Sequence, residues 1–299
     1  MSGGGHGGAA HVILHTHTPL RLRRTILGVA CQTRRPDTLT VSCDSDNAEI
    51  EAVCRGAAAE FGMPMTVILR GHTGKGRSAQ AKNNAVRSLL RRGADRAPAV
   101  LIFFDGDCVP EPEAVARHER LCWGAGPTGG LVIGRRFNLT EAQDSLFDEA
   151  AMRRGGWPVM PGAEEAAFLA RKDRAYRRQA FLKRLGLCKE HKPKVLGSNF
   201  GVPMEAFLAI NGHDETYEGW GGEDDDLGRR LYRSGVRPVV AVKDIAVFHQ
   251  WHKTLAPGQW HDAPNSRRLR EPCETVAAMG VRTPREQPEP REIEIPAGG

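Results

Sequence analysis

Short apolar runs alternate with helical patterns near the start of this chain, and the alternation limits it to few folds. Residues 11–14, 39–43 and 65–69 have the apolar, β-branched character of strands. Residues 20–32 and 49–61, between those runs, place apolar side chains at helical spacing. Strands that alternate with helices pair in parallel through right-handed crossovers. The sequence therefore predicts an α/β fold with a mostly parallel, mixed central sheet flanked by helices.

The polar residues that follow the predicted strands mark one edge of that sheet. Ligands of such sheets bind beyond the carboxyl ends of the strands. Thr16 and Asp44 follow the first two strands, and the glycine-rich loop 71–78 follows the third. We expect these three segments to converge on one crevice.

Residues 99–104 form an uninterrupted apolar run, as in the central strand of a parallel sheet, and the run ends in Asp105-Gly106-Asp107. Two carboxylates separated by a glycine can both turn toward a hard divalent cation. A simple turn is the alternative. The position at the end of a central strand favours Asp105 and Asp107 as metal ligands.

The loop 71–78 contains Gly-His-Thr-Gly-Lys-Gly-Arg-Ser. The spacing of its glycines and the residue after Lys75 exclude a P-loop. A dinucleotide fingerprint is disfavoured, because that motif follows the first strand of its unit. Lys75 and Arg77 are candidates for neutralising a pyrophosphate, and the alternative is a solvated basic loop.

Residues 220–227 read Trp-Gly-Gly-Glu-Asp-Asp-Asp-Leu, and a helical pattern follows that ends near Ser234-Gly235. The four acids therefore occupy the first turn of a helix. Negative charge is favoured there, but four adjacent acids repel one another and only one or two can cap free N–H groups. At least one acid is thus available for chemistry, such as taking a proton from a bound hydroxyl.

The aromatic residue and the two glycines before these acids suit a sugar. Trp220 offers a flat apolar wall with one polar N–H, and Gly221 and Gly222 leave space beside it. The alternative is a charged helix start after a glycine turn.

The run resembles the acceptor site of galactosyltransferase-like sugar transferases, in which Trp-Gly-Gly-Glu-Asp precedes a helix. The resemblance covers residues 197–235 and includes Gly197-Ser198-Asn199-Phe200-Gly201. It implies that Asp224 is the catalytic base and Trp220 the sugar platform. It also implies that four further residues of the run bind the acceptor: Gly221, Gly222, Glu223 and Asp225.

The first half of the chain resembles family 2 glycosyltransferases, which have the glycosyltransferase A-type fold with a Rossmann-like nucleotide-binding half. This resemblance implies that Asp44 contacts the nucleoside and that Asn83 belongs to the donor site. Asp105-x-Asp107 matches the Asp-x-Asp signature of metal-dependent members, with Asp105 reaching the cation or the donor ribose. In related transferases a downstream histidine completes the metal site; we expect His249, with His252 as the fallback, because imidazole ligates manganese well.

A basic segment separates the two halves. Residues 171–194 contain ten Lys or Arg against two acids, whereas the whole chain has a net charge of +6. A solvated helix face is the simplest explanation. The functional alternatives are an anionic acceptor, such as a lipid-linked diphosphate, or an anionic membrane surface. Nucleic acid is not expected, because no aromatic residues interleave with the charges and no binding motif is present.

The domain organisation follows from these patterns. Residues 1–10 are glycine-rich and lack the features of a signal peptide, and the proline-rich residues 256–299 are expected to be a disordered tail. The remaining chain is expected to form one transferase domain with three parts: a nucleotide-sugar-binding half at 11–136, a basic helical insertion at 137–196 and an acceptor and catalytic half at 197–255.

The seven cysteines are odd in number and show neither Cys-x-x-Cys pairs nor zinc spacing, which favours reduced thiols in the cytoplasm. No run approaches the roughly 20 apolar residues that span a bilayer. We therefore expect a cytoplasmic protein, with peripheral attachment to the inner membrane face through the basic segment as the alternative.

Together the two resemblances imply a metal-dependent, inverting glycosyltransferase that uses Mn²⁺ or Mg²⁺. It would move a hexose from a nucleoside-diphosphate sugar, with uridine diphosphate as the expected carrier, to a hydroxyl of a glycan or lipid-linked acceptor. The alternatives are a nucleotidyltransferase that makes the nucleotide sugar, and a non-catalytic sugar- or nucleotide-binding protein.

Overall fold

The computed structural model describes residues 8–72, 74–126, 129–156, 162–219, 221–253 and 264–298. Its strands are, in chain order, β1 Ala9–Thr16, β2 Thr38–Cys43, β3 Met65–Leu69, β4 Ala99–Asp105, β5 Cys108–Pro110, β6 Gly130–Ile133, β7 Arg135–Asn138, β8 Asn199–Pro203, β9 Arg237–Val240, β10 Ala246–His249 and β11 Arg291–Ile295.

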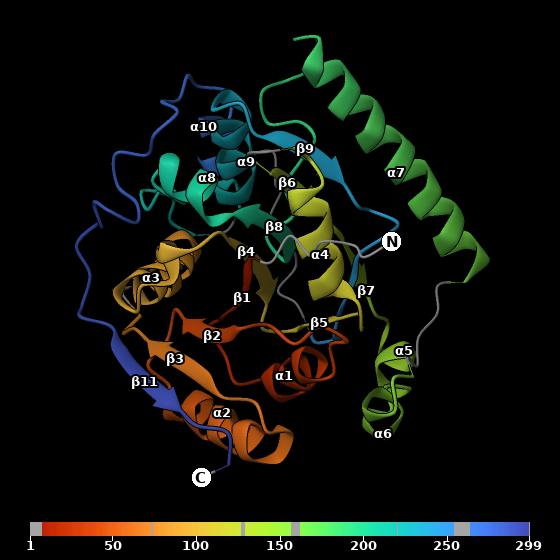
Figure 1. The fold of residues 1–299 in the computed structure, drawn as a ribbon, viewed down its shortest axis with the longest axis vertical. Helices are drawn as coiled ribbons and strands as arrows, with labels where there is room; N and C mark the ends of the chain where they lie inside the picture. Colours follow the sequence, from red (N-terminus) through yellow and green to blue (C-terminus); the bar gives the residue numbers. More distant parts are fainter. Residues whose placement is uncertain are drawn as a thin grey trace.

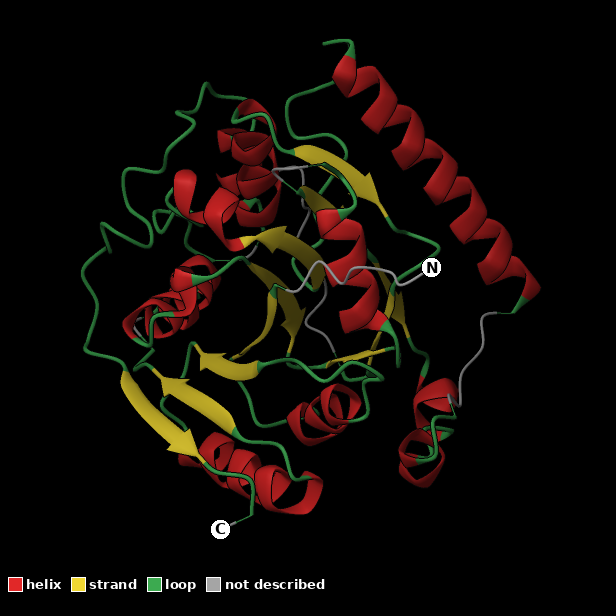
Figure 2. Ribbon diagram, in the orientation of Figure 1, coloured by secondary structure: helices red, strands yellow, loops and turns green. Residues whose placement is uncertain are grey.

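The helices cover both faces of the main sheet (Figure 2). They are α1 Leu22–Ala30, α2 Ala48–Phe61, α3 Ser78–Arg91, the 3₁₀ turn η1 Ala94–Arg96, α4 Ala114–Trp123, α5 Glu141–Ser145, α6 Glu149–Arg153, α7 Ala163–Arg184, α8 Met204–Ala209, α9 Glu223–Arg233 and α10 Pro264–Arg268.

The main sheet has eight described strands in the order β11-β3-β2-β1-β4-β8-β6-β9 (Figure 1). The four strands from β3 to β4 run parallel to one another, as their alternation with helices predicts. β8 is antiparallel to both β4 and β6, and β11 is antiparallel to β3. The prediction of a mostly parallel, mixed sheet flanked by helices is confirmed.

Two apolar cores lie on opposite faces of this sheet. Successive strand residues point to opposite faces, so Val12 and Leu14 pack with α1, α2 and α4, whereas Ile13 packs with α3, α8 and α9. Phe103 stacks on Phe200 of β8 at 4.6 Å between ring centroids. Because apolar side chains fill both faces, the polar strand ends at one edge are left for a site.

A second, three-stranded sheet in the order β5-β10-β7 lies beside that edge. β10 pairs antiparallel with β5, and the register sets His249 opposite Cys108. This pairing carries the end of β10 to the Asp105-Gly106-Asp107 turn, which is far away in sequence.

Two predicted boundaries are wrong. Residues 9 and 10 belong to β1 and not to a flexible leader, since Ala10 is fully buried between β2 and β4. The predicted disordered tail is also wrong for residues 264–298: β11 pairs with β3 and buries Ile295. The hydrogen bonds between β11 and β3 and the burial of Ile295 stabilise this segment, although it contains few apolar residues. The rest of the predicted leader and tail lies outside the described residues, except residue 8; it comprises residues 1–7, 256–263 and 299.

Candidate active site

Three loops meet at the carboxyl ends of the parallel strands. The backbone N–H of Asp44 donates to the carbonyl of Thr16 at 2.9 Å, and that of Gly106 donates to His15 at 2.7 Å. A side chain at Gly106 would collide with Thr16, its Cβ lying 2.7 Å from the threonine Cβ. The glycine between the two aspartates thus allows the β4 turn to close against β1.

Asp107 lies beside two histidines from the far end of the domain. One of its carboxylate oxygens is 3.3 Å from Nε2 of His249 and 3.2 Å from Nε2 of His252. The possible ligand atoms of these three residues all lie within 4.8 Å of one another. Burial raises the pKa of Asp107, but the hydrogen bond and charge of His249, with help from Cys108 and His252, outweigh it and lower the pKa to about 2.

A carboxylate and two imidazoles form a donor set that suits Mn²⁺. The fallback ligand, His252, is as close to Asp107 as His249 is, so the structure brings both histidines to the same carboxylate. Asp105 and Asp107, with Cys108, form a second group whose possible ligand atoms are within 4.8 Å. The residues present therefore fit a divalent cation.

Asp105 turns toward the other half of the site. Burial raises its pKa to about 6, against the lowering effect of Lys82 and with further raising by Asp107 and Asp224. A carboxyl group on β4 and one on α9 therefore influence each other directly. Asp107 thus lies beside His249 and His252, whereas Asp105 lies toward the start of α9.

The carboxylate run forms the first turn of α9, as its sequence predicts. Gly221 and Gly222 have φ of 88° and 92°, a backbone conformation that favours glycine. They reverse the chain so that Asp224 enters the crevice, where its Oδ1 accepts a hydrogen bond from Nζ of Lys82 at 2.9 Å. Glu223 lies beside it: burial, then the charge of Asp224, raises the pKa of Glu223 to about 7 against the pull of Lys82.

The other two acids of the run have different surroundings. Asp226 is buried and accepts hydrogen bonds from Nε of Arg229 at 3.0 Å and Nε of Arg230 at 2.7 Å, which makes it an anchor of α9. Asp225 is buried and pairs with Lys194 at 3.0 Å. Its Oδ1 has no hydrogen-bond partner among the described residues. Asp225 thus retains a free acceptor atom close to Asp224.

Lys82 and Gly197 are residues of this site to which the sequence assigns no role. Lys82 is 2% exposed, and burial lowers its pKa, but Asp224, Glu223 and Asp105 together raise the pKa above its usual value. A Cβ on Gly197 would lie 2.0 Å from Oδ2 of Asp224. The signal that could have found Lys82 is its position among the apolar residues Ala79 and Val86 at helical spacing. Nothing in the local sequence indicates the role of Gly197.

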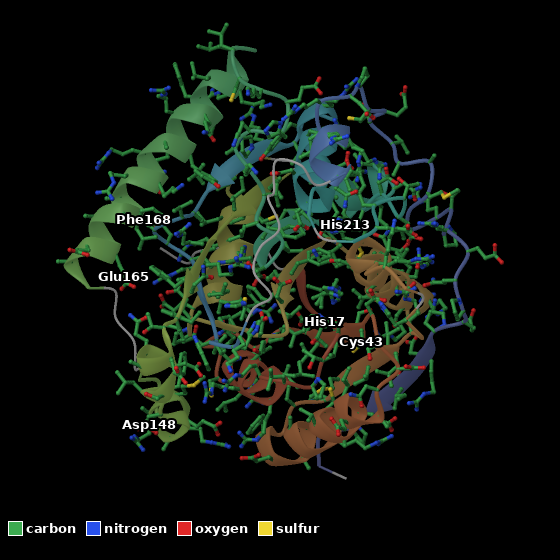
Figure 3. All side chains as sticks on the ribbon, turned by 180° about the vertical axis from the view of Figure 1, so that it is seen from behind. His17, Cys43, Asp148, Glu165, Phe168 and His213 are labelled. Carbon is green, nitrogen blue, oxygen red and sulfur yellow. The ribbon has the colours of Figure 1, made fainter. Side chains whose placement is uncertain are left out.

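Two residues predicted for the donor site have their polar groups occupied elsewhere. Asn83 is fully buried, donates to the carbonyl of His213 and to Glu215, and accepts from the His213 N–H, so its amide already has partners within the protein and its donor contact stays a prediction. The hydroxyl of Thr16 donates to the carbonyl of Thr18 at 2.8 Å and holds the turn. Figure 3 labels His213, whose side chain is fully buried.

Asp44 reaches the crevice but already has partners. It pairs with the buried guanidinium of Arg70, and it accepts from the backbone N–H of Arg77 at 2.5 Å. Its carboxylate therefore orders the start of the glycine-rich loop. The nucleoside contact that the resemblance implies stays a prediction.

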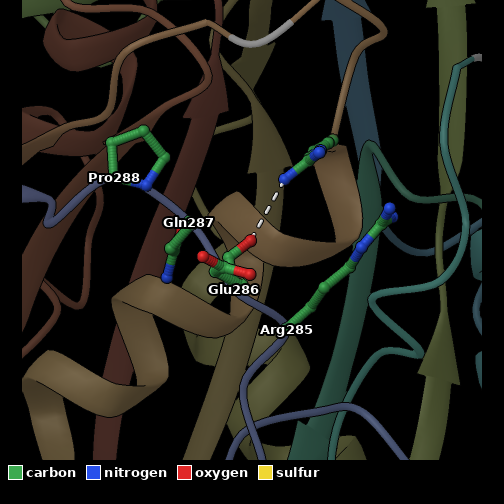
Figure 4. Close-up of a pocket in the computed structure, with 5 residues that line it drawn as sticks. Arg285, Glu286, Gln287 and Pro288 are labelled. Atoms are coloured by element: carbon green, nitrogen blue, oxygen red, sulfur yellow. Dashed lines mark hydrogen bonds between the residues drawn. The ribbon is translucent and has the colours of Figure 1, made fainter.

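The two basic residues of that loop, Lys75 and Arg77, have different surroundings. Arg77 pairs with Glu218 at 3.4 Å and donates to the carbonyl of Glu286 at 3.3 Å (Figure 4). There it lines a pocket of about 500 Å³ with residues 285–288. Lys75 is exposed and forms no ion pair within the described part of the chain. Trp220, the predicted sugar platform, lies outside the described residues.

Solved structures share this arrangement of strands and helices. A crystal structure of GalNAc-T7 with UDP, GalNAc and Mn²⁺ superposes with a TM-score of 0.51 and 17% sequence identity, covering 89% of this chain and 48% of that one. The chain has the glycosyltransferase A-type fold, as the sequence predicts.

The sequence comparisons identify the second half more closely. Residues 182–253 match the family model described as the N-terminal domain of galactosyltransferase. Over 83 residues the chain is 30% identical to β-1,4-galactosyltransferase 2 of Mus musculus, covering 28% of this chain and 22% of that protein. Over 39 residues it is 49% identical to β-1,4-galactosyltransferase 6 of Rattus norvegicus, covering 13% and 10%. This glycosyltransferase A-type chain thus contains a segment that is similar to galactosyltransferases, and it matches less than a quarter of the length of these curated relatives.

Proposed function

We propose that this protein is a metal-dependent, inverting glycosyltransferase that moves a hexose from a uridine-diphosphate sugar to an acceptor hydroxyl. The observation that carries the proposal is the meeting of two sets of residues from distant parts of the chain. Asp107 with His249 and His252 forms a cation-binding group, and Asp224 lies on the other side of Asp105. These are the two parts that sugar transfer requires.

Asp107, His249 and His252 would hold the cation, with Asp105 beside them. A bound Mn²⁺ or Mg²⁺ supplies charge neutralisation for the diphosphate leaving group. The low pKa of Asp107 supports this role, because a carboxylate that stays ionised near neutral pH needs no deprotonation before it binds a metal.

Asp224 acts on the acceptor. Lys82 fixes one carboxylate oxygen at 2.9 Å, so the group is oriented before the acceptor binds. As the acceptor oxygen bonds to the anomeric carbon, the bond from that carbon to the diphosphate oxygen breaks and the hydroxyl proton passes to Asp224. Attack comes from the face opposite the leaving group, so a single displacement inverts the configuration.

The acceptor is expected to be a glycan or lipid-linked sugar held by the segment that leads into α9. Glu223 and the unpaired oxygen of Asp225 offer hydrogen-bond acceptors for its hydroxyls, and Trp220 is assigned to stack on its ring. The donor is assigned to the crevice that Asp44 and Asp105 line. Seven free thiols support the predicted cytoplasmic location.

The test has a binding step and a turnover step. We expect uridine-diphosphate sugars to raise the melting temperature only when Mn²⁺ is present, and we expect transfer or slow hydrolysis of the stabilising donor. Asp224→Asn should keep the metal-dependent shift and lose turnover by about 10²-fold or more. Asp95→Asn, the same change at an exposed position away from the crevice, should alter neither.

Other outcomes would identify the alternatives. Release of pyrophosphate from a nucleoside triphosphate and a sugar phosphate would indicate a nucleotidyltransferase. Binding without turnover, unchanged by Asp224→Asn, would indicate a sugar- or nucleotide-binding protein. Indifference to every nucleotide sugar, with and without metal, would contradict the proposal.

A further inference from the structure

The 22-residue helix α7 lies along the outer edge of the molecule (Figure 1). One side of it packs on β9 and its surroundings through Leu169, Tyr176 and Ala180. These positions are seven and four residues apart, and the buried Asp173 lies between the first two, so together they define the inner side of the helix. The opposite side is exposed in the monomer.

The exposed side carries one continuous stripe. Positions 171, 174, 178, 181 and 185 again follow helical spacing, and all five side chains are exposed: Arg171, Arg174, Arg178, Phe181 and Leu185. At 1.5 Å per residue the stripe is about 21 Å long. It is basic at one end and apolar at the other.

The apolar end continues past the helix in an ordered turn. Gly186, with φ of 71°, allows Gly186 and Leu187 to donate to the carbonyls of Lys183 and Leu182, which ends the helix in a Schellman motif. Lys183 then donates to the carbonyls of residues 189 and 190 at 2.8 and 2.7 Å. The exposure of Leu187 therefore comes from a fixed turn and not from a frayed end.

This tip exposes large apolar side chains that globular surfaces seldom group together. Phe181 is 58% exposed, Leu185 56% and Leu187 70%. The apolar tip is flanked by the exposed cations Arg178, Arg184 and Lys189. Exposed apolar side chains with basic side chains beside them are typical of surfaces that enter the headgroup region of a bilayer.

The charge of the stripe is not neutralised within the protein. Arg171, Arg174 and Arg178 form no ion pair with any described residue. Glu165, in the first turn of the helix (Figure 3 labels it), instead accepts from the backbone N–H of Gly162 and caps the helix. Arg177, by contrast, pairs with Asp173 at 2.7 Å and belongs to the fold. The outward arginines are thus free to meet an external anion.

We propose that the outer side of α7 and its apolar tip dock onto an anionic lipid bilayer. The arginine stripe attracts the negative headgroups, an attraction that falls off within a Debye length, and Phe181, Leu185 and Leu187 enter the boundary of the acyl chains. A row of spaced cations is complementary in charge to an anionic bilayer surface, and the apolar side chains at its end match the boundary of the acyl chains. The surface lies outside the cation and carboxylate cluster, so the inference is independent of the proposed reaction.

The test measures co-sedimentation of the full chain with vesicles. We expect binding to phosphatidylcholine vesicles that contain about 30% phosphatidylglycerol, and little binding to pure phosphatidylcholine. Salt at about 0.5 M should weaken the binding. Leu185→Ser with Leu187→Ser, and separately the change of Arg171, Arg174 and Arg178 to Glu, should each reduce partitioning about 10-fold or more.

Matched variants control for general changes of surface character. Leu20→Ser with Leu146→Ser alters two leucines that are 53% and 65% exposed elsewhere, and should leave partitioning unchanged. The change of Arg96, Arg120 and Arg270 to Glu alters the net charge equally at exposed positions away from α7. Circular dichroism confirms that each variant is folded. Absence of vesicle binding at low salt, or equal losses in the α7 variants and their controls, would overturn the proposal.

Discussion

The ammonium nitrogen of Lys82 lies 2.9 Å from Oδ1 of Asp224, which is 142 positions away in the sequence. This ion pair joins α3 to α9. Lys82 is almost completely buried and faces three carboxyl groups, those of Asp224, Glu223 and Asp105. A single buried cation therefore offsets the repulsion between acids that the proposed reaction needs close together.

Replacing Lys82 by Met should impair catalysis because it removes the positive charge, since methionine has a side chain of similar size. Lys82 lowers the pKa of Glu223, which is already raised to about 7, so removing the cation moves that pKa higher and leaves Glu223 protonated at neutral pH. We expect kcat/KM to fall by about 10²-fold and the acidic limb of its pH profile to move to higher pH. Lys82→Arg should recover part of the activity. An unmoved acidic limb in Lys82→Met would contradict this role.

Gly197→Ala should displace Asp224 without unfolding the protein. The new Cβ would lie 2.0 Å from the Asp224 carboxylate, whereas the backbone of residue 197 has no positive φ that would disfavour alanine. Turnover should fall roughly 10- to 100-fold, because a small misplacement of a catalytic group is costly. Metal-dependent stabilisation by donor should remain.

The matched control for that variant is Gly56→Ala. This glycine lies on the exposed side of α2, and nothing lies within 4 Å of its would-be Cβ. Alanine there should raise the free energy of unfolding by about 0.5 to 1 kcal/mol and leave turnover unchanged. If Gly197→Ala retains full activity, the close approach of Asp224 has no catalytic consequence.

The sequence predicts the parallel half of the fold well, because its signals are local. β4 follows from an uninterrupted apolar run, and α2 from its helical spacing, with Asn47 as N-cap and Gly62 after its end. β8 was not predicted, since its five residues, Asn-Phe-Gly-Val-Pro, contain a glycine and a proline that normally weaken or end strands. Pairing with β4 and β6 on both sides overrides that local preference.

β11 and the site contacts show the limit of such reasoning. The strand near the C-terminus alternates charged and apolar residues over only a few positions, and it forms because the edge of β3 is available to pair with it. Motif spacing predicts that Asp105, Asp107 and Asp224 belong to one site. It does not predict that Lys82 bridges to Asp224, or that Asn83 next to it turns inward, because each depends on packing between distant segments.

Asp226→Asn should destabilise the protein far more than it changes the chemistry. Asp226 accepts hydrogen bonds from Arg229 and Arg230, and all three side chains are at most 4% exposed. Loss of the carboxylate leaves two buried guanidinium groups without their counterion, which should cost about 3 to 5 kcal/mol of unfolding free energy in a urea titration. Glu113→Gln removes an exposed pair with Arg117 and should cost less than about 1 kcal/mol. Equal effects of the two variants would contradict the anchoring role of Asp226.

His118 should make the fold less stable in mild acid. Its side chain is fully buried, and its Nε2–H donates to Oδ1 of Asn199 at 2.8 Å; the amide nitrogen of Asn199 donates to two carbonyls, so the oxygen must accept. Burial lowers the pKa of His118 from 6.5 to about 4, against the raising effect of that bond.

The unfolded chain therefore binds a proton at His118 below pH 6.5, whereas the folded protein does so only near pH 4. The resulting stability is fully present above pH 6.5 and is lost as the pH falls toward 4, and the loss is about 2 kcal/mol at pH 5. Urea titrations at pH 8 and pH 5 measure it. His118→Gln keeps a donor for Asn199 and removes the titration, so the difference in unfolding free energy between the two pH values should shrink by about that amount. A residual slope is expected, because burial also lowers the pKa of His15 and His213. If the unfolding free energy depends on pH identically in wild type and His118→Gln, burial does not lower the pKa of His118.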